Sequence, residues 1–251
     1  VLRPTGIILR NDTAVRELEG LARYVEIAQG QVPDRVTVVE GGCRFEVSLA
    51  EGQKTGWFYD QAANRDQFVR YVRGLRVLDV CSYVGAWSLR AAHAGADGVV
   101  AVDASAHALE QAMHNAELNG LGDRVSSLQG DAFDALRELR TARERFDVVV
   151  LDPPAFIKRK KDLKEGMLAY RRLNEAALGL LARDGLLVSA SCSFHMQRDQ
   201  LLRTVLQSAR HGDRGLQLLQ QGQQGPDHPI HPAIPETAYL KALYLRVLPT
   251  L

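Results

Sequence analysis

Short apolar runs alternate with amphipathic stretches along most of the chain from Arg76 onward. Five valine- and leucine-rich runs are typical of buried strands: RVLDVCS (76–82), GVVAVDAS (98–105), RVSSLQGD (124–131), FDVVVLDPP (146–154) and GLLVSASCS (185–193). Two stretches show the three-and-four spacing of a buried helix face: Leu173, Ala176, Ala177, Leu180 and Leu181, then Leu202, Val205, Leu206 and Ala209. This alternation predicts right-handed crossovers and a doubly wound, mostly parallel α/β sheet.

The pattern changes at both ends of the chain. After Gly212, LQLLQQG (216–222) and ALYLRVL (242–248) predict two strands that pair as antiparallel edge strands. Before Phe68, GIILRN, RVTVVE and RFEVSL predict strands around a short helix from Thr13 to Leu21. We therefore expect a small α+β annex at residues 1–58 and a larger α/β domain at residues 59–251.

Composition narrows the class of protein. Hydrophobic residues make up 46% and charged residues 24%, which excludes a disordered or fibrous chain. No apolar run approaches the roughly 20 residues of a membrane helix, and no secretory leader opens the chain, so we expect a soluble protein. The three cysteines lack metal-ligand spacing, which favours a reducing cytoplasm and no bound metal. Because the net charge is only +1, nucleic-acid binding would depend on local basic clusters.

Carboxylates occur where the predicted parallel strands end, and ligands bind at this edge of such sheets. Asp79 precedes a loop that reaches Gly85, and Asp103, Asp131 and Asp152 end the next three strands. The acidic residue after the second strand suits ribose hydroxyls. The chain lacks both the G-x-G-x-x-G and the phosphate-loop patterns, so a cofactor with a ribose and no phosphate is favoured, such as S-adenosylmethionine (SAM). Each aspartate taken alone is equally typical of a helix N-cap.

Several motifs together resemble a known family. VLDVCSYVGAWSLRAA, VDASAHALEQAMHNAELNGL, GDAFDAL, FDVVVLDPPAF and SASCS resemble the class I SAM-dependent methyltransferases, which implies a Rossmann-like fold. With EGQKTGWFYDQAANR, DHP and PETAYLKALYLRV, the chain resembles the ribosomal RNA large subunit methyltransferase I family from about Gly6 to its C-terminus. That family makes 5-methylcytosine in 23S ribosomal RNA. Its members usually carry an additional N-terminal RNA-binding PUA domain without counterpart here, and the chain begins with Val1, so we expect a processed or trimmed chain.

The resemblance also implies roles for single residues. The expected SAM contacts are Asp79, Ser82, Tyr83, Gly85, Asp103, Ala104, Asp131, Ala132, Asp152 and Pro153. A loop expected to cover the cofactor contributes Lys54, Phe58, Asp60, Gln61 and Arg65. The basic run Lys158, Arg159, Lys160 and Lys161 follows DPPAF directly, so we expect it to contact RNA phosphates. A solvated charged loop explains the same run equally well.

Cys192 is the predicted nucleophile. Carbon 5 of cytosine reacts poorly with a sulfonium methyl group, whereas a thiolate that adds to carbon 6 makes carbon 5 an enamine carbon. Asp152 would raise the pKa of a neighbouring thiol, so we expect it to hydrogen-bond to ring nitrogen 3 and the exocyclic amine instead. Glu236 and a water molecule are equal candidates for the base that removes the carbon 5 proton. Cys43 and Cys81 are expected to be structural.

Two alternatives stay open at this point. In the first, the protein methylates an exocyclic amine or a small molecule, and Cys192 is a small apolar filler. The DPP motif is similar to the [DN]PP[YF] motif of such enzymes, although Phe156 stands one position later. In the second, the protein is a SAM-binding RNA assembly factor without turnover. The sequence also leaves open the modified nucleotide, the form of the RNA substrate and homodimer formation.

Overall fold

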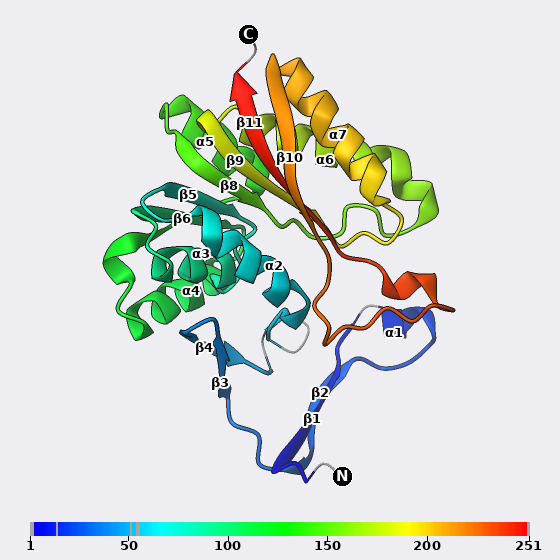
Figure 1. Ribbon diagram of the computed structural model, residues 1–251. Coiled ribbons are helices and arrows are strands. Elements are labelled where there is room, and N and C mark those ends of the chain that lie inside the picture. Colours follow the sequence, from blue (N-terminus) through cyan, green and yellow to red (C-terminus); the bar gives the residue numbers. More distant parts are fainter. Residues whose placement is uncertain (1–2, 14, 51, 54–55, 250–251) are drawn as a thin grey trace. The chain divides into compact units, whose positions relative to one another are not determined.

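The computed structural model describes residues 3–13, 15–50, 52–53 and 56–249 (Figure 1). Residues 1–40 and 44–58 form one compact unit, and residues 41–43 and 59–251 form the other. The independent folding of an annex at residues 1–58 stays a prediction. No described helix is long and apolar enough to cross a membrane.

The first unit consists of two short β-ribbons. Strand β1 (Gly6–Asn11) pairs antiparallel with β2 (Tyr24–Gly30), β3 (Arg35–Glu40) pairs with β4 (Cys43–Ser48), and helix α1 is Val15–Leu18. The expected helix is thus only four residues long, and β2 is a strand that the sequence analysis missed. All seven residues of β2 are exposed, so no alternation of buried and exposed positions marks it.

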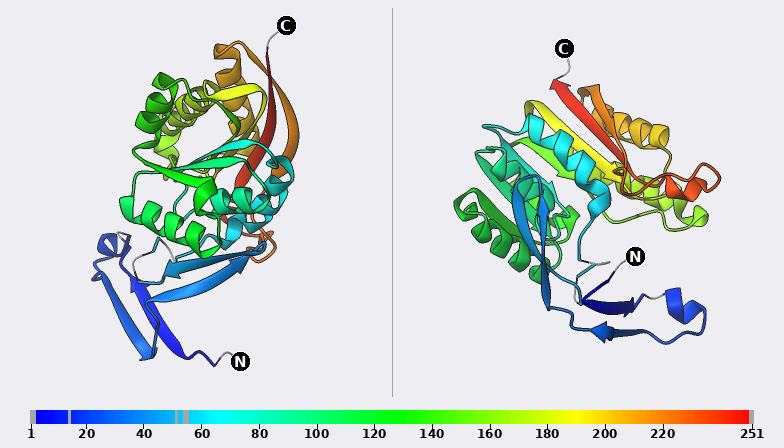
Figure 2. Two further views of the ribbon diagram at one scale, coloured as in Figure 1. Left: turned by 90° about the vertical axis from the view of Figure 1, so that its left-hand side faces the viewer. Right: turned by 60° about the horizontal axis from the view of Figure 1, so that its bottom comes forward.

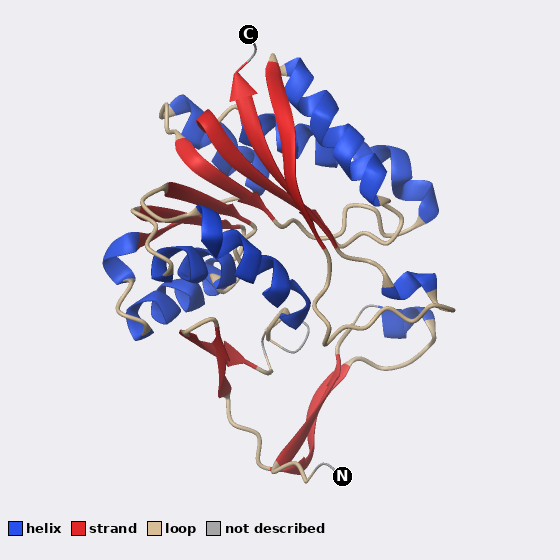
Figure 3. Ribbon diagram, viewed as in Figure 1, coloured by secondary structure: helices blue, strands red, loops and turns tan. Residues whose placement is uncertain are grey.

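A seven-stranded sheet forms the centre of the second unit, in the order β10-β11-β9-β8-β5-β6-β7 (Figure 3). Its strands are β5 (Arg76–Val80), β6 (Gly98–Asp103), β7 (Val125–Gln129), β8 (Phe146–Leu151), β9 (Leu181–Ser191), β10 (Arg214–Gly222) and β11 (Lys241–Pro249). The strands β5 to β9 pair in parallel, and β11 pairs antiparallel with both β9 and β10. The predicted mostly parallel sheet with an antiparallel C-terminal strand is confirmed.

The expectation that both C-terminal strands lie at the edge is wrong for β11. It runs between β9 and β10, and its residues 241–245 are all buried. An interior strand is covered on both faces, which explains why ALYL is a continuous apolar run rather than an alternating one. Of the two C-terminal strands, only β10 lies at an edge of the sheet.

Helices cover both faces of this sheet (Figures 1 and 2). Helices α2 (Ala62–Phe68), α3 (Ala86–His93) and α4 (Ala106–Leu118) lie on one face, and α5 (Ala132–Thr141), α6 (Leu163–Leu178) and α7 (Arg198–His211) on the other. Short 3₁₀ turns are η1 (Tyr59–Gln61), η2 (Val69–Tyr71), η3 (Gly122–Arg124), η4 (Lys160–Asp162) and η5 (Pro235–Thr237). The apolar helix face predicted from Leu173 to Leu181 is too long, because α6 ends at Leu178 and Leu181 begins β9. Leu180 and Leu181 are buried in the same core as α6, so the apolar pattern continues beyond the end of the helix.

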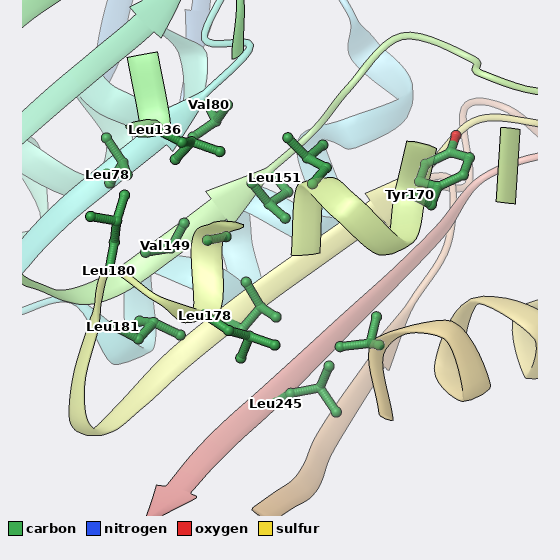
Figure 4. Packing of buried hydrophobic residues seen from close by; sticks show 14 of the residues in the cluster. Leu78, Val80, Leu136, Val149, Leu151, Tyr170, Leu178, Leu180, Leu181 and Leu245 are labelled. Carbon is green, nitrogen blue, oxygen red and sulfur yellow. The ribbon is translucent and has the colours of Figure 1, made fainter. Parts of the chain in front are cut away.

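The main core lies between the sheet and helices α5, α6 and α7 (Figure 4). Val149 and Leu151 of β8 pack there with Leu136 of α5 and Leu178 of α6. Full burial of one such leucine contributes about 1.5–3 kcal/mol to folding. Tyr170 of α6 joins the same cluster, and its hydroxyl oxygen is the polar atom at its end (Figure 4).

The strand order reverses at β5. Strands β6 and β7 follow on one side of it, and β8 and β9 on the other. This is the point where open α/β sheets bind ligands, outside the carboxyl ends of the strands. The loop after β5 bends sharply into α3, with positive φ angles at Cys81 (66°), Tyr83 (52°) and Gly85 (85°). A β-carbon on Gly85 would lie 2.7 Å from the side chain of Leu89, so the turn requires glycine.

Candidate functional site

Asp79 is the penultimate residue of β5, and its carboxyl group is fully buried. Its Oδ2 atom accepts hydrogen bonds from the backbone amide (3.0 Å) and the hydroxyl (2.6 Å) of Ser88. Its Oδ1 atom and the hydroxyl of Ser82 are buried without a hydrogen bond to any described residue. Burial, followed by the negative charges of Asp152 and Asp103, raises the pKa of Asp79 to about 7 despite the bonds from Ser88.

Asp103 ends β6 and holds the loop that follows β5. Its Oδ2 atom accepts a hydrogen bond from the backbone amide of Tyr83 (2.9 Å), and its Oδ1 atom accepts one from the amide of Ser105 (2.9 Å). Each carboxylate oxygen can accept a second hydrogen bond. Asp103 is half-buried, so both oxygens can still receive ribose hydroxyls.

Asp131 is the N-cap of α5. Its Oδ1 atom accepts a hydrogen bond from the backbone amide of Phe133 (2.9 Å), which satisfies one of the first amides of the helix. The capping role that the sequence left open is therefore present here. Asp131 and Ala104 are exposed, and Ala132 is half-buried at the first position of α5. Their contact with a cofactor stays a prediction.

Asp152 follows β8 and is fixed by two side chains. The Gln61 amide donates to its Oδ1 atom (2.8 Å), and the indole of Trp87 donates to its Oδ2 atom (3.0 Å). Burial raises the pKa of Asp152, although the bond from Trp87 and the charge of Arg65 act in the opposite direction. Pro153 comes next and is buried. Trp87 lies within the motif VLDVCSYVGAWSLRAA, but nothing in the sequence predicts its hydrogen bond to Asp152.

The structure describes four of the five residues expected to cover the cofactor. Asp60 and Gln61 lie in η1 and Arg65 in α2, and all three are buried. Asp60 accepts a hydrogen bond from the hydroxyl of Tyr239 (2.7 Å). Phe58 is a half-buried residue of the first compact unit. Lys54 lies outside the described residues.

The four strand-end carboxylates all act on the thiol of Cys81. Burial raises the pKa of this thiol first, and the negative charges of four aspartates raise it further: Asp103, Asp152, Asp79 and Asp131. These side chains therefore gather around the carboxyl end of β5, as their spacing in the sequence suggested. A thiol in this environment stays protonated at neutral pH and is not a nucleophile.

Cys192 follows β9 between two anchored serines. The hydroxyl of Ser191 donates to the hydroxyl oxygen of Tyr170 (2.9 Å), and Tyr170 and Ser193 share a hydrogen bond of 3.0 Å. The backbone amide of Ile157 also donates to the Ser193 hydroxyl (3.1 Å). Both serine hydroxyls are thus hydrogen-bonded to Tyr170 of α6. This network fixes the backbone on either side of the half-buried cysteine.

Lys241 is a site residue that the sequence analysis missed. It begins β11, pairs with Ser191 of β9 and is only 5% exposed. Its ammonium donates to the backbone carbonyl oxygens of Ser193 (2.6 Å) and Tyr239 (2.7 Å). A lysine at the start of the apolar run ALYL was the available signal, because lysine is almost never fully buried without a partner.

The remaining predicted residues lie on the surface. Glu236 is exposed in η5, and its carboxylate makes no hydrogen bond or ion pair with a described residue. Lys158, Arg159, Lys160 and Lys161 are all exposed. Arg159 pairs with Asp162 (Nε–Oδ2 3.1 Å). In the described part of the chain no three histidine, cysteine or acidic side chains gather in a way that could hold a metal ion.

The residues around β5 fit SAM. SAM carries a positive sulfonium and a positive ammonium, and four carboxylates surround this position. The buried Oδ1 atom of Asp79 and the Ser82 hydroxyl have unused hydrogen-bonding capacity, which a polar ligand can satisfy. Asp103 keeps acceptor capacity for a ribose. These three residues would hold the cofactor.

Comparison with known proteins agrees with this fit. A family model described as "S-adenosylmethionine-dependent methyltransferase" matches residues 22–246. The curated relatives include "Ribosomal RNA large subunit methyltransferase I" of Aeromonas hydrophila, 40% identical over 244 residues, which are 96% of this chain and 62% of the relative. The protein of the same name from Shewanella denitrificans is 38% identical with the same coverage. The chain thus spans about three fifths of the length of these relatives.

Solved structures show the same fold. SMU.776, solved as a complex with SAH, superposes with a TM-score of 0.79 at 24% identity, over 88% of this chain and 58% of that one. A SAM-dependent methyltransferase from Agrobacterium tumefaciens superposes with a TM-score of 0.67 at 20% identity, over 91% of this chain and 74% of that one.

Proposed function

Because the chain belongs to the S-adenosylmethionine-dependent methyltransferase family, we propose that it methylates carbon 5 of a cytosine in RNA through a covalent adduct with Cys192. The RNA we propose is 23S ribosomal RNA, since the curated relatives are named for the large ribosomal subunit. Ribosomal RNA as the substrate and three free cysteines favour the cytoplasm as the location.

The environment of Cys192 is the observation that carries this proposal. Strands β8 and β9 pair in parallel, with Leu151 opposite Ser189, so Asp152 and Cys192 follow the carboxyl ends of neighbouring strands. A cysteine that only filled space would need neither the hydroxyl network of Tyr170 nor a buried cation beside it. Cys81, among four carboxylates, lacks such support.

The reaction follows from the properties of these residues. When bound, SAM supplies an electrophilic methyl group. The Cys192 thiolate adds to carbon 6 of the cytosine, and the electrons of the carbon 5–carbon 6 double bond become available at carbon 5 for the new bond. After methylation, a base takes the carbon 5 proton, the double bond forms again and the thiolate leaves. Glu236 and a water molecule remain the candidates for this base.

Asp152 has the surroundings that its proposed role needs. Gln61 and Trp87 hold its carboxyl group in one orientation, and burial raises its pKa. A group that retains a proton more readily than usual can donate it to ring nitrogen 3 as the thiolate attacks, which neutralises the charge that develops on the ring. The oxygen that does not carry the proton keeps one lone pair for the exocyclic amine.

The basic run beside the site supplies the proposed contact with RNA. Ile157 is buried, and its amide is bound to the Ser193 hydroxyl, so the loop that carries Lys158 to Lys161 starts next to Cys192. The exposed cations can contact phosphates and add affinity without sequence information. We also propose that residues 1–58 fold as a separate annex.

Labelled SAM tests the proposal. Wild type and Cys192→Ala are incubated with radiolabelled SAM and unmodified large-subunit ribosomal RNA, and the labelled nucleoside is identified after digestion. The proposal requires 5-methylcytosine from wild type and none from the variant. RNA that contains 5-fluorocytosine should trap wild type covalently, because fluorine cannot leave carbon 5 as a proton does. Cys81→Ala serves as the matched cysteine control.

The other outcomes contradict the proposal in different ways. Label in another nucleoside or in a small molecule, or full activity of Cys192→Ala, indicates an amino or small-molecule methyltransferase with a structural cysteine. SAM binding without turnover on any form of the RNA indicates an assembly factor.

A further inference from the structure

Lys241 is a buried cation whose hydrogen-bond partners are both neutral. Its side chain is only 5% exposed, and its ammonium donates to the carbonyl oxygens of Ser193 and Tyr239. Within the described residues it makes no ion pair with a carboxylate. A buried ammonium without a counter-charge is costly, so a negative group is expected nearby.

The acidic group that interacts with Lys241 is the thiol of Cys192. Lys241 pairs with Ser191 across β9 and β11, and its ammonium is bound to the carbonyl of Ser193, so it contacts the backbone on both sides of the cysteine. The charge of Cys192 stabilises the charge of Lys241, and Arg198 is the cation that opposes it. Burial is the largest effect, and together with the positive charge of Arg198 it lowers the pKa of Lys241 to about 8 despite the attraction of Cys192.

We propose that Lys241 is the positioning residue that holds the Cys192 side chain as a thiolate. This inference rests on the proposed function, because it names the group that activates the proposed nucleophile. The two carbonyl oxygens hold the ammonium next to the backbone that carries Cys192. The contrast with Cys81 is physical: the thiol of Cys81 faces four carboxylates and stays protonated, whereas the charge of Lys241 opposes the effect that Asp152, after the neighbouring strand β8, has on Cys192.

The charge balance of the reaction agrees with this role. Lys241 stays an ammonium throughout and neither gives nor takes a proton. The lone pair of the thiolate forms the sulfur–carbon 6 bond. The negative charge that Lys241 balances therefore moves from the sulfur onto the ring. When that bond breaks, the electron pair returns to sulfur and the ion pair forms again. An opposite charge within about 4–6 Å lowers a pKa by roughly 1–3 units, which raises the ratio of thiolate to thiol by about tenfold to thousandfold.

Other titratable groups also face the thiol and enter its pH profile. Tyr170 from α6 and Tyr239 from the segment before β11 both interact with Cys192, and burial raises the pKa of each hydroxyl. Both are therefore neutral at pH 7. Arg198 of α7 is a second cation near Lys241 and donates to the carbonyl of Gly222 (2.9 Å). Lys241 remains the cation bound directly beside the cysteine.

The rate of alkylation by iodoacetamide measures the thiolate directly. Full-length wild type, Lys241→Met and Lys241→Arg are treated between pH 5.5 and 9.5, and the modified Cys192 peptide is quantified by mass spectrometry. In wild type we expect half-maximal reactivity below the ordinary cysteine pKa of about 8.5. Lys241→Met should move this midpoint upward by about one unit or more and slow alkylation at pH 7 about tenfold. Lys241→Arg keeps the charge and should keep the midpoint lower than Lys241→Met does.

A purely structural lysine would give another result. Identical pH midpoints for wild type and a folded Lys241→Met overturn the inference, as does a wild-type midpoint at or above about 8.5. The wild-type profile decides the question even if Lys241→Met does not fold. Failure of the proposed function is recognised separately in the labelling experiment, by full activity of Cys192→Ala, by label in a product other than 5-methylcytosine, or by SAM binding without turnover. An inactive Cys192→Ala together with an unchanged profile in Lys241→Met overturns the inference alone.

Discussion

Asp79 should make the cofactor-free protein less stable as the pH rises. One of its oxygens accepts two hydrogen bonds from Ser88, and the other is buried without a bond to any described residue. Burial therefore dominates and raises its pKa from 3.8 to about 7. Between these two values the folded state holds a proton that the unfolded state has lost, so the free energy of unfolding falls as the pH rises through this range.

The size of the effect follows from the shift. Each pKa unit corresponds to about 1.36 kcal/mol, so the full loss is about 4 kcal/mol above pH 7, with about 2–3 kcal/mol of it between pH 5 and pH 8. Asp79→Asn removes the titration and keeps an oxygen for Ser88. The buried amide donors of asparagine cost about 1–3 kcal/mol at every pH, so only the slope with pH is informative.

Urea unfolding at pH 5, 6, 7 and 8 without SAM measures this slope. Between pH 5 and pH 8, the free energy of unfolding of wild type should fall by about 2–3 kcal/mol more than that of Asp79→Asn. The exposed Asp97→Asn serves as the matched control and should retain the wild-type slope. Asp152 shares the same carboxylate cluster, so some slope should remain in Asp79→Asn. Parallel profiles for wild type and Asp79→Asn would refute the conclusion that burial keeps this carboxyl group protonated.

Two further predictions concern the ligands. Asp103→Ala removes the acceptors proposed for the ribose and should weaken SAM binding at least tenfold in isothermal titration calorimetry, since one hydrogen bond to a charged group contributes about 1.5–3 kcal/mol. An unchanged dissociation constant would exclude Asp103 from the cofactor site. Lys158→Gln combined with Lys160→Gln should reduce the slope of log K against log salt by about 0.7 for each lost contact with single-stranded RNA, without a change in SAM affinity. An unchanged slope in filter binding would show that the run is only a solvated loop.

The sequence determined most of the sheet and the location of the acidic site. Buried strands leave continuous apolar runs, and strand–helix alternation permits few topologies, so β5 to β9 and the aspartates after them could be placed from local pattern alone. The loop that reaches Gly85 was expected from the sequence, and the structure adds that Gly85 has a left-handed backbone, which favours glycine.

Contacts between distant segments were decided by the tertiary structure. No periodicity marks the exposed strand β2, and none shows that β11 inserts between β9 and β10. That insertion places Lys241 opposite Ser191 and thus beside Cys192, while the packing of α2 and α3 brings Gln61 and Trp87 to Asp152. A hydrophobic pattern records whether a position is buried and not which residue lies against it. The sequence therefore identified the cysteine and the carboxylates, and only the fold showed which charges surround each of them.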